Sequence, residues 1–186
     1  MRNAILIHGW GGRPQRDWFP WAKKELEKNG LDVIIPKMPD TENPIIKKWI
    51  NKIDEISRNI QKDTVFVGHS IGCQAILRFL ETQNDNFKIN KLILIAPWWF
   101  LDLESKEEKA IAKPWLETFI DFNKIKAKVG KIICVFSDDD PVVPLDKNIN
   151  FFREKLNPEI IIKDNMGHFT QEEGIIELPF LADLVK

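Results

Sequence analysis

The sequence predicts an α/β fold, in which a mostly parallel sheet of about six strands lies between two layers of helices. Three observations lead to this prediction. Short β-branched runs alternate with longer amphipathic stretches, which is typical of buried parallel strands joined by crossover helices. The length of 186 residues suits one compact domain over residues 1–186. The 44% hydrophobic and 30% charged residues are typical of a globular protein.

Six short segments rich in Val, Ile and Leu predict the strands. In chain order they are Ala4–Ile7, Asp32–Ile35, Thr64–Val67, Lys91–Ala96, Lys131–Phe136 and Glu159–Ile162. We expect a single open sheet in which the second strand lies at one edge, followed by the first, third, fourth, fifth and sixth.

Amphipathic stretches between the strands predict the helices. Phe19, Ala22 and Leu26 share one face of the first, which is expected to stop at Asn29-Gly30. The predicted helices are Trp18–Asn29, Ile46–Ile60, Cys73–Thr82, one helix between Glu107 and Phe122, Leu145–Leu156 and Ile175–Val185. No repeat or low-complexity linker interrupts this order, so no internal domain boundary is expected.

Composition argues against several classes of function. The 27 basic and 28 acidic side chains give a net charge of −1, so no global field would attract nucleic acid. The longest apolar runs are far shorter than the ~18 residues of a membrane span, and the first residues do not resemble a signal peptide. The only cysteines, Cys73 and Cys134, are too few for a disulfide framework or a four-ligand zinc site. We expect a reduced, cytoplasmic protein without a metal or organic cofactor.

Gly68-His69-Ser70-Ile71-Gly72 forms a G-x-S-x-G motif between a predicted strand and a predicted helix. In such a sharp turn, the residues two before and two after the serine must be small, and the serine hydroxyl lies at the carboxyl end of the sheet. This context favours a nucleophile over a plain glycine-rich turn. The Ile71 amide, at the start of the helix, is expected to point toward the oxyanion that forms after attack.

A serine nucleophile needs a base, and the chain has three histidines. His8 ends the first strand, where loop packing is its expected role, and His69 is expected to point away along the turn. His168 follows the last strand, so in a parallel sheet it emerges at the same edge as Ser70. The sequence therefore predicts His168 as the general base.

Three consecutive aspartates, Asp138–Asp140, follow the fifth strand at the same edge. One of them could fix the tautomer of the imidazole and stabilise its charged form. Side chains alternate along an extended chain, so at most two of the three can face His168. The order Ser, Asp, His along the chain is that of the α/β-hydrolases. An acidic loop can also be a solvated turn, but the order and position favour a catalytic triad.

The glycine-rich loop His8-Gly9-Trp10-Gly11-Gly12 directly follows the first strand. Loops of this type supply the second amide of an oxyanion hole, and we assign that donor to Trp10. A phosphate-binding loop is disfavoured because the G-x-G-x-x-G pattern is absent and no lysine or serine stands as in a P-loop.

Seven tryptophans are many for this length. Trp98 and Trp99 follow the fourth strand, at the edge where the candidate catalytic residues gather. They could wall an apolar substrate pocket or pack in the core, and both interpretations stay open. Core packing is the expected role of Trp18, Trp21 and Trp49.

Several motifs occur together in a fixed order along nearly the whole chain. The motifs are His8-Gly9-Trp10-Gly11-Gly12, Asp17-Trp18 with Trp21, Pro36-Lys37-Met38-Pro39, Pro44 and Trp49, Val67 to Cys73, Asp140-Pro141 with Val143-Pro144, and Gly167-His168-Phe169. In this combination the sequence resembles the small serine hydrolases of the retinoblastoma-binding protein 9 / YdeN family.

The resemblance implies an α/β-hydrolase core without a cap domain and a triad of Ser70, Asp140 and His168. Only the short segment 97–123 stands where larger relatives carry a cap. Asp140 is preferred because its spacing to Val143-Pro144 matches the acid loop of this fold and because Pro141 keeps it extended, with Asp138 as the second choice. The protein-binding L-x-C-x-E motif of the vertebrate member is absent, so a retinoblastoma-type partner does not transfer.

The sequence thus predicts a serine hydrolase that cleaves small ester or amide substrates through an acyl-enzyme. A small-molecule substrate is the expected partner, and no nucleic acid or membrane partner is expected. The alternative, from another class, is a non-catalytic binding or regulatory protein that keeps the hydrolase scaffold.

Overall fold

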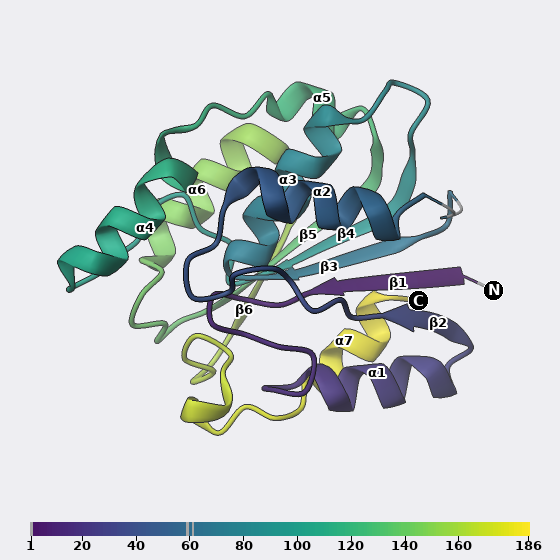
Figure 1. Cartoon of the computed structure of the whole chain (residues 1–186). Helices are drawn as coiled ribbons and strands as arrows, with labels where there is room; N and C mark the ends of the chain where they lie inside the picture. The colour runs from purple at the N-terminus through teal and green to yellow at the C-terminus, as the bar shows by residue number, and fades with distance from the viewer. Residues whose placement is uncertain (1, 59, 61) are drawn as a thin grey trace.

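A computed structural model describes residues 2–58, 60 and 62–186 (Figure 1). The six described strands pair in parallel in the order β2-β1-β3-β4-β5-β6, as predicted. The elements are β1 (Arg2–Ile7), α1 (Phe19–Lys28), β2 (Leu31–Ile34), α2 (Ile46–Ile56), β3 (Val65–His69), α3 (Ile71–Thr82), β4 (Ile89–Ile95), α4 (Lys106–Glu117), α5 (Phe122–Lys126), β5 (Val129–Ser137), α6 (Leu145–Leu156), β6 (Glu159–Lys163), the 3₁₀ turn η1 (Gln171–Glu173) and α7 (Pro179–Leu184).

The sheet lies between two layers of helices, which gives the predicted αβα architecture. Helices α1 and α7 cover one face, and α2, α3, α5 and α6 cover the other (Figure 1). The two chain ends lie close together at the edge where the strands begin, and the Arg2 guanidinium donates to the Lys186 carbonyl at 3.0 Å. All six strands have their carboxyl ends at the opposite end of the sheet, so the loops that follow the strands lie together there.

Successive strand residues point to opposite faces and enter two separate hydrophobic cores. In β1, Ile5 and Ile7 belong to the core beneath α2 and α3, whereas Ala4 and Leu6 belong to the core beneath α1 and α7. The same alternation continues through β3, β4 and β5. Strands buried on both faces read as continuous apolar runs, which is why the sequence identified them. Trp18 and Trp49 are fully buried and Trp21 packs against the core of α1 and α7, as predicted.

One helix was predicted between Glu107 and Phe122, and α4 occupies most of that interval; α5, which begins at Phe122, was not predicted. Helix α4 ends at Glu117, and Thr118 is already extended. Asp121 begins α5, since its carboxylate accepts hydrogen bonds from the Asn123 and Lys124 amides. This is an N-cap, which aspartate forms readily, and it starts a new helix rather than continuing the old one.

Two further helix boundaries differ from the prediction by four residues. The last helix begins at Pro179 and not at Ile175, because the residue before a proline is kept out of the helical region and proline itself suits the first helical turn. Helix α2 ends at Ile56, with Ser57 as its C-cap. The prediction extended it to Ile60, across residue 59, which lies outside the described residues.

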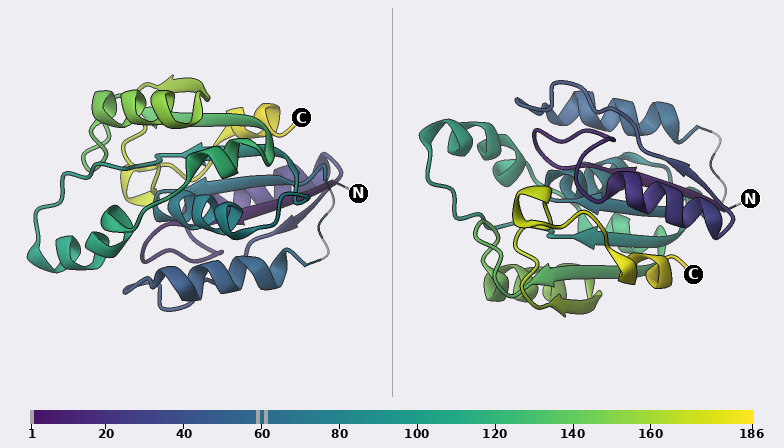
Figure 2. Two further views of the ribbon diagram at one scale, coloured as in Figure 1. Left: turned by 90° about the horizontal axis from the view of Figure 1, so that it is seen from above. Right: turned by 90° about the horizontal axis from the view of Figure 1, so that it is seen from below.

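The segment from Pro97 to Asn123, which stands in the position of a cap domain, carries α4. Figure 2 shows α4 projecting from the body of the molecule beside the edge where the strands end. The segment is anchored by Trp115, which is fully buried and donates from its indole to the Pro44 carbonyl at 2.9 Å. Within the described part of the chain, no helix has the length and apolar character that crossing a bilayer requires.

Candidate active site

Ser70 occupies the turn between β3 and α3 with φ 53° and ψ −121°. Such a conformation costs a side-chain-bearing residue on the order of 1–3 kcal/mol. Two backbone hydrogen bonds hold it, from the Ser70 amide to the Ile95 carbonyl and from the Cys73 amide to the Ser70 carbonyl, each 2.9 Å long. This backbone conformation points the Ser70 side chain out of the turn at the carboxyl end of β3.

The two glycines of the motif are required by close backbone contacts. A Cβ on Gly72 would lie 2.4 Å from the Ile7 carbonyl oxygen, at the end of β1. A Cβ on Gly68 would lie 2.8 Å from the backbone of Cys73. The turn around Ser70 therefore packs against β1 and the start of α3 only when positions 68 and 72 both lack a side chain, as the motif predicted.

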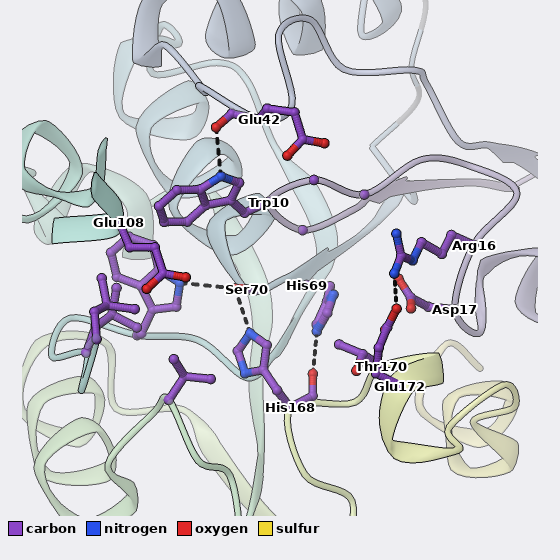
Figure 3. Close-up of a pocket in the computed structure, with 17 residues that line it drawn as sticks. Trp10, Arg16, Asp17, Glu42, His69, Ser70, Glu108, His168, Thr170 and Glu172 are labelled. Carbon is purple, nitrogen blue, oxygen red and sulfur yellow. Dashed lines mark hydrogen bonds and ion pairs between the residues drawn. The ribbon is translucent and has the colours of Figure 1, made fainter. Parts of the chain in front are cut away.

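Ser70, His168 and Asp140 come from three different loops and form one chain of hydrogen bonds. The Ser70 hydroxyl donates to Nε2 of His168 at 2.9 Å, and Nδ1 of His168 donates to Oδ2 of Asp140 at 2.8 Å (Figure 3 shows the first contact). The Asp140 side chain is only 2% exposed, against 17% for His168. The structure thus brings together the three residues that the sequence selected.

The three adjacent aspartates have three different partners. Oδ1 of Asp140 accepts the Val142 and Val143 amides at 2.9 and 3.0 Å, so its other oxygen is left for His168. Asp138 accepts the Asn165 amide, and Asp139 accepts the Ser137 hydroxyl and the Gly167 amide. The bond from Ser137 and then that from Gly167 lower the pKa of Asp139. Asp138 and Asp139 therefore tie the acid loop to the histidine loop, while Asp140 contacts the imidazole.

His69 differs from the prediction that it points away along the turn. Its Nε2 donates to the backbone carbonyl of His168 at 2.8 Å, and the two rings lie 5.2 Å apart (Figure 3). Because β3 continues to His69, this side chain faces the same side as Val65 and Val67, where the histidine loop passes. Burial, with a smaller effect of nearby His168, lowers the pKa of His69 to about 3. His69 is therefore a neutral donor that positions the histidine loop.

His8 has the loop-packing role that was expected. Its Nδ1 lies 3.0 Å from the Gly9 carbonyl, and its Nε2 accepts the Met38 amide at 3.2 Å. Burial lowers the pKa of His8, which keeps the imidazole in the neutral form that these two contacts need.

The glycine-rich loop after β1 lies beside Ser70. The Gly11 amide donates to the Thr41 carbonyl at 2.9 Å and the Gly12 amide to the Gly9 carbonyl at 3.1 Å. Among the described residues, no acceptor takes the Trp10 amide or the Ile71 amide, the two donors assigned to the oxyanion hole. The Trp10 indole is tied back to the Glu42 carbonyl at 3.0 Å, which holds the loop open over the serine (Figure 3).

A pocket of about 410 Å³ opens above Ser70 and His168. Trp98 lines it and Trp99 does not, so of the two roles left open for this pair, the pocket role fits Trp98 and the packing role fits Trp99. Trp99 turns to the other side of the chain, where its ring stacks on Phe151 at 4.8 Å. Gly9, Trp10, Leu101, Leu103 and Val142 are among the other lining residues, together with the charged side chains Arg16, Asp17, Glu42, Glu108 and Glu172.

Cys73 lies in the first turn of α3 and is fully buried, with its thiol donating to the Ile95 carbonyl at 3.3 Å. Burial raises the pKa of the Cys73 thiol, so this side chain packs and does not ionise. In residues 2–58, 60 and 62–186, no three His, Cys, Asp or Glu side chains are grouped in a way that could hold a metal ion.

Two known proteins are similar in sequence to nearly the whole of this chain. The chain is 26% identical over 184 residues to the YdeN protein of Bacillus subtilis, covering 99% of this chain and 94% of that protein. It is 28% identical over 177 residues to the serine hydrolase RBBP9 of Rattus norvegicus, covering 92% and 89% of the two chains.

Solved structures and a family pattern agree with these relatives. The crystal structure of the Bacillus subtilis ydeN gene product superposes with a TM-score of 0.90, covering 100% of this chain and 97% of that chain at 26% identity. Est1E from Butyrivibrio proteoclasticus shares the fold with a TM-score of 0.75, covering 100% and 87% at 16% identity. The sequence pattern of the serine hydrolase family matches residues 4–186. The chain therefore belongs to the serine hydrolase family and has the α/β-hydrolase fold.

Proposed function

We propose that this hydrolase cleaves small esters through a triad of Ser70, His168 and Asp140 and a covalent acyl-enzyme. The observation that carries the proposal is the pair of hydrogen bonds, 2.9 and 2.8 Å long, that joins the Ser70 hydroxyl through the imidazole of His168 to the Asp140 carboxylate. A serine so placed can give up its proton as it attacks a carbonyl carbon.

In the first step, Oγ of Ser70 bonds to the carbonyl carbon while its proton moves to Nε2 of His168. The buried Asp140 carboxylate stabilises the imidazolium and keeps its second nitrogen protonated. The Trp10 and Ile71 amides donate to the oxyanion of the tetrahedral intermediate, since neither has an acceptor among the described residues. Trp10 lines the pocket together with Ser70, and Ile71 directly follows Ser70 in the chain. His168 then protonates the leaving alcohol as the acyl-enzyme forms.

In the second step, water attacks the acyl carbon as His168 takes one of its protons, and the acid and free Ser70 are released. Amide substrates would follow the same route with an amine as the leaving group. No step calls for a metal or organic cofactor, because the attack, the proton transfers and the oxyanion contacts all have donors within this chain.

The pocket favours short or medium acyl groups. Its volume of about 410 Å³ lies near the lower end of ligand sites, which run from roughly 300 to 1,000 Å³. Leu101 and Leu103, in the segment that leads to α4, border it without closing it. We therefore infer that dissolved short esters are better substrates than long-chain emulsified lipids, and that no activation occurs at a lipid surface.

A fluorophosphonate probe with intact-mass and peptide analysis tests the proposal. We expect it to label Ser70 in the wild type and to leave Ser70→Ala unlabelled and inactive toward p-nitrophenyl esters of graded chain length. Cys73→Ala is a matched control, since this residue lies in the first turn of α3, three positions after Ser70, but outside the hydrogen-bond chain. A folded wild type that neither reacts with the probe nor hydrolyses esters would instead support the non-catalytic binding protein.

The cytoplasmic location expected from the composition is part of the same proposal. Cys73 and Cys134 are both buried and unpaired, and burial raises the pKa of each thiol. Two buried free thiols suit a reducing compartment.

A further inference from the structure

A second side chain besides His168 contacts the candidate nucleophile. The indole Nε1 of Trp98 donates to Oγ of Ser70 at 3.3 Å, while Oγ lies 2.9 Å from Nε2 of His168. The serine hydroxyl therefore gives its proton toward one ring and accepts a hydrogen bond from another. A tryptophan that only walled a pocket would not need its N–H at this atom.

The position of the Trp98 indole is fixed by its surroundings. Trp98 is only 1% exposed, and its backbone carbonyl accepts the Gln74 side-chain amide of α3 at 2.7 Å. The next amide, that of Trp99, donates to the Asn148 side chain of α6 at 2.7 Å. Ala96, just after β4, has φ 47°, so the chain leaves the strand in a sharp turn before it reaches Trp98. Helices on both sides therefore hold the indole against Ser70.

We propose that Trp98 is a catalytic residue whose indole N–H stabilises negative charge on Oγ of Ser70 when the acyl-enzyme breaks down. The proposal rests on the acyl-enzyme mechanism above. In this step the water oxygen has bonded to the acyl carbon and its proton has passed to His168. The bond from the acyl carbon to Oγ then breaks, its electron pair goes to Oγ, and the proton returns from Nε2 of His168 to Oγ.

The hydrogen bond contributes more to deacylation than to acylation because the two steps start from different states. In the free enzyme Oγ is a hydroxyl that already accepts the bond, so attack on the substrate gains only the difference in strength. In the acyl-enzyme Oγ is the singly bonded ester oxygen, which is a weaker acceptor. As the electron pair returns to Oγ, the contact becomes a charge-assisted hydrogen bond, which is roughly twice as strong as a neutral one.

Trp98→Phe keeps an aromatic ring and removes the N–H. With p-nitrophenyl acetate, we expect the steady-state rate to fall about tenfold, the rate of the first p-nitrophenol release to change less than about threefold, and mass spectrometry to find a larger fraction of enzyme acylated during turnover. Trp99→Phe is the matched control, since the neighbouring indole stacks on Phe151 outside the pocket, and it should behave as the wild type.

The hydrogen bond itself can be observed without turnover and without changing the indole. In ¹³C,¹⁵N-labelled protein, the Trp98 indole resonance, assigned through its bonds to the Trp98 backbone, should shift in Ser70→Ala and on fluorophosphonate labelling. The Trp99 resonance should shift much less. If Trp98→Phe misfolds, an unmoved Trp98 resonance in Ser70→Ala would by itself overturn the proposal.

Two kinetic outcomes would also contradict the proposal that the Trp98 indole acts on deacylation. Equal acylated fractions in the wild type and a folded Trp98→Phe would show that the N–H does not act on deacylation. Faster acylation in Trp98→Phe would show that the indole restrains the serine instead. Both outcomes leave the triad intact. A wild type whose Ser70 is not labelled by the fluorophosphonate would overturn the proposed function and this inference together.

Discussion

The imidazole of His69 donates a hydrogen bond to the backbone carbonyl of His168, across 99 positions of sequence, at 2.8 Å. The residue that precedes the candidate nucleophile thus holds the loop that carries the candidate base. Because the His69 ring is neutral and nearly fully buried, the contact is a fixed structural link between the end of β3 and the histidine loop. It couples the two loops whose side chains must meet.

We expect His69→Phe to lower kcat about tenfold, because the loop that carries His168 loses the donor that fixes it. His69→Gln, which can still donate an N–H to the same carbonyl, should recover much of the activity. The pKa of His69 is about 3, so His69 does not change its charge above pH 5. In a plot of kcat/KM against pH above pH 5, the pH of half-maximal activity should therefore be the same in both variants as in the wild type. A shifted midpoint would show that His69 itself titrates in the reaction.

The depressed pKa of His69 also makes stability depend on pH. Burial lowers this pKa from 6.5 to about 3, so below pH 6.5 the unfolded chain binds a proton that the folded chain does not. The stabilisation is fully present above pH 6.5 and is lost progressively as the pH falls toward 3. Between pH 6.5 and 5 the free energy of unfolding should fall by roughly 1–2 kcal/mol from this group.

Urea unfolding followed by tryptophan fluorescence at a series of pH values measures that loss. Burial lowers the pKa of His8 in the same direction, so the wild type should lose somewhat more than His69 alone explains. His69→Phe should show a flatter dependence over the same range. Equal slopes in the two proteins would contradict the assignment to His69.

Asp140→Asn should leave the fold intact but lower kcat by on the order of 10³ to 10⁴, the scale that this substitution has in another triad enzyme. An amide at this position no longer selects the tautomer of His168 that accepts the serine proton. Asp138→Asn and Asp139→Asn should cost less than about tenfold, since their oxygens accept backbone amides that an asparagine oxygen can also accept. If the Asp138→Asn variant were inactive and the Asp140→Asn variant active, Asp138 and not Asp140 would be the acid of the triad.

Gly72→Ala should destabilise the protein by about 1–3 kcal/mol or more and abolish activity, because its Cβ would lie 2.4 Å from the Ile7 carbonyl oxygen. Neither β1 nor α3 can move away without breaking the turn at Ser70. Gly30→Ala is the comparison, since no atom lies within 4 Å of the added Cβ and only its φ of 81° is unfavourable. Thermal melting and ester hydrolysis of both variants check the difference.

The charged lining of the pocket predicts discrimination against anionic esters. Asp17, Glu42, Glu108 and Glu172 supply four carboxylates against the one guanidinium of Arg16, which is itself paired with Glu172. A neutral ester should therefore have a several-fold lower KM than an ester of equal size with a free carboxylate. The gap should narrow as salt is added and in Glu108→Gln. A gap that salt leaves unchanged would point to shape and not charge.

The order of the sheet, the nature of each strand and the positions of Ser70, His168 and the acid loop could be derived from the sequence alone. These features depend on local patterns: continuous apolar runs mark strands buried on both faces, and parallel strands deliver the loops after them to one edge. The end of α4 at Glu117 and the start of α7 at Pro179 were harder to predict from the sequence, because a single capping residue or proline sets such a boundary where the hydrophobic periodicity is weak.

Only the tertiary structure decided which side chains meet at that edge. Pattern and resemblance favoured Asp140, but its hydrogen bond to His168 depends on how two loops dock. Trp98 and Trp99 are indistinguishable in sequence, yet one indole lies on Ser70 and the other on Phe151, since the packing of α3 and α6 turns them to opposite sides. The contact of His69 likewise joins residues far apart in the chain. Periodicity specifies which face a residue takes, whereas the partner it finds there is set by elements that fold against it from elsewhere.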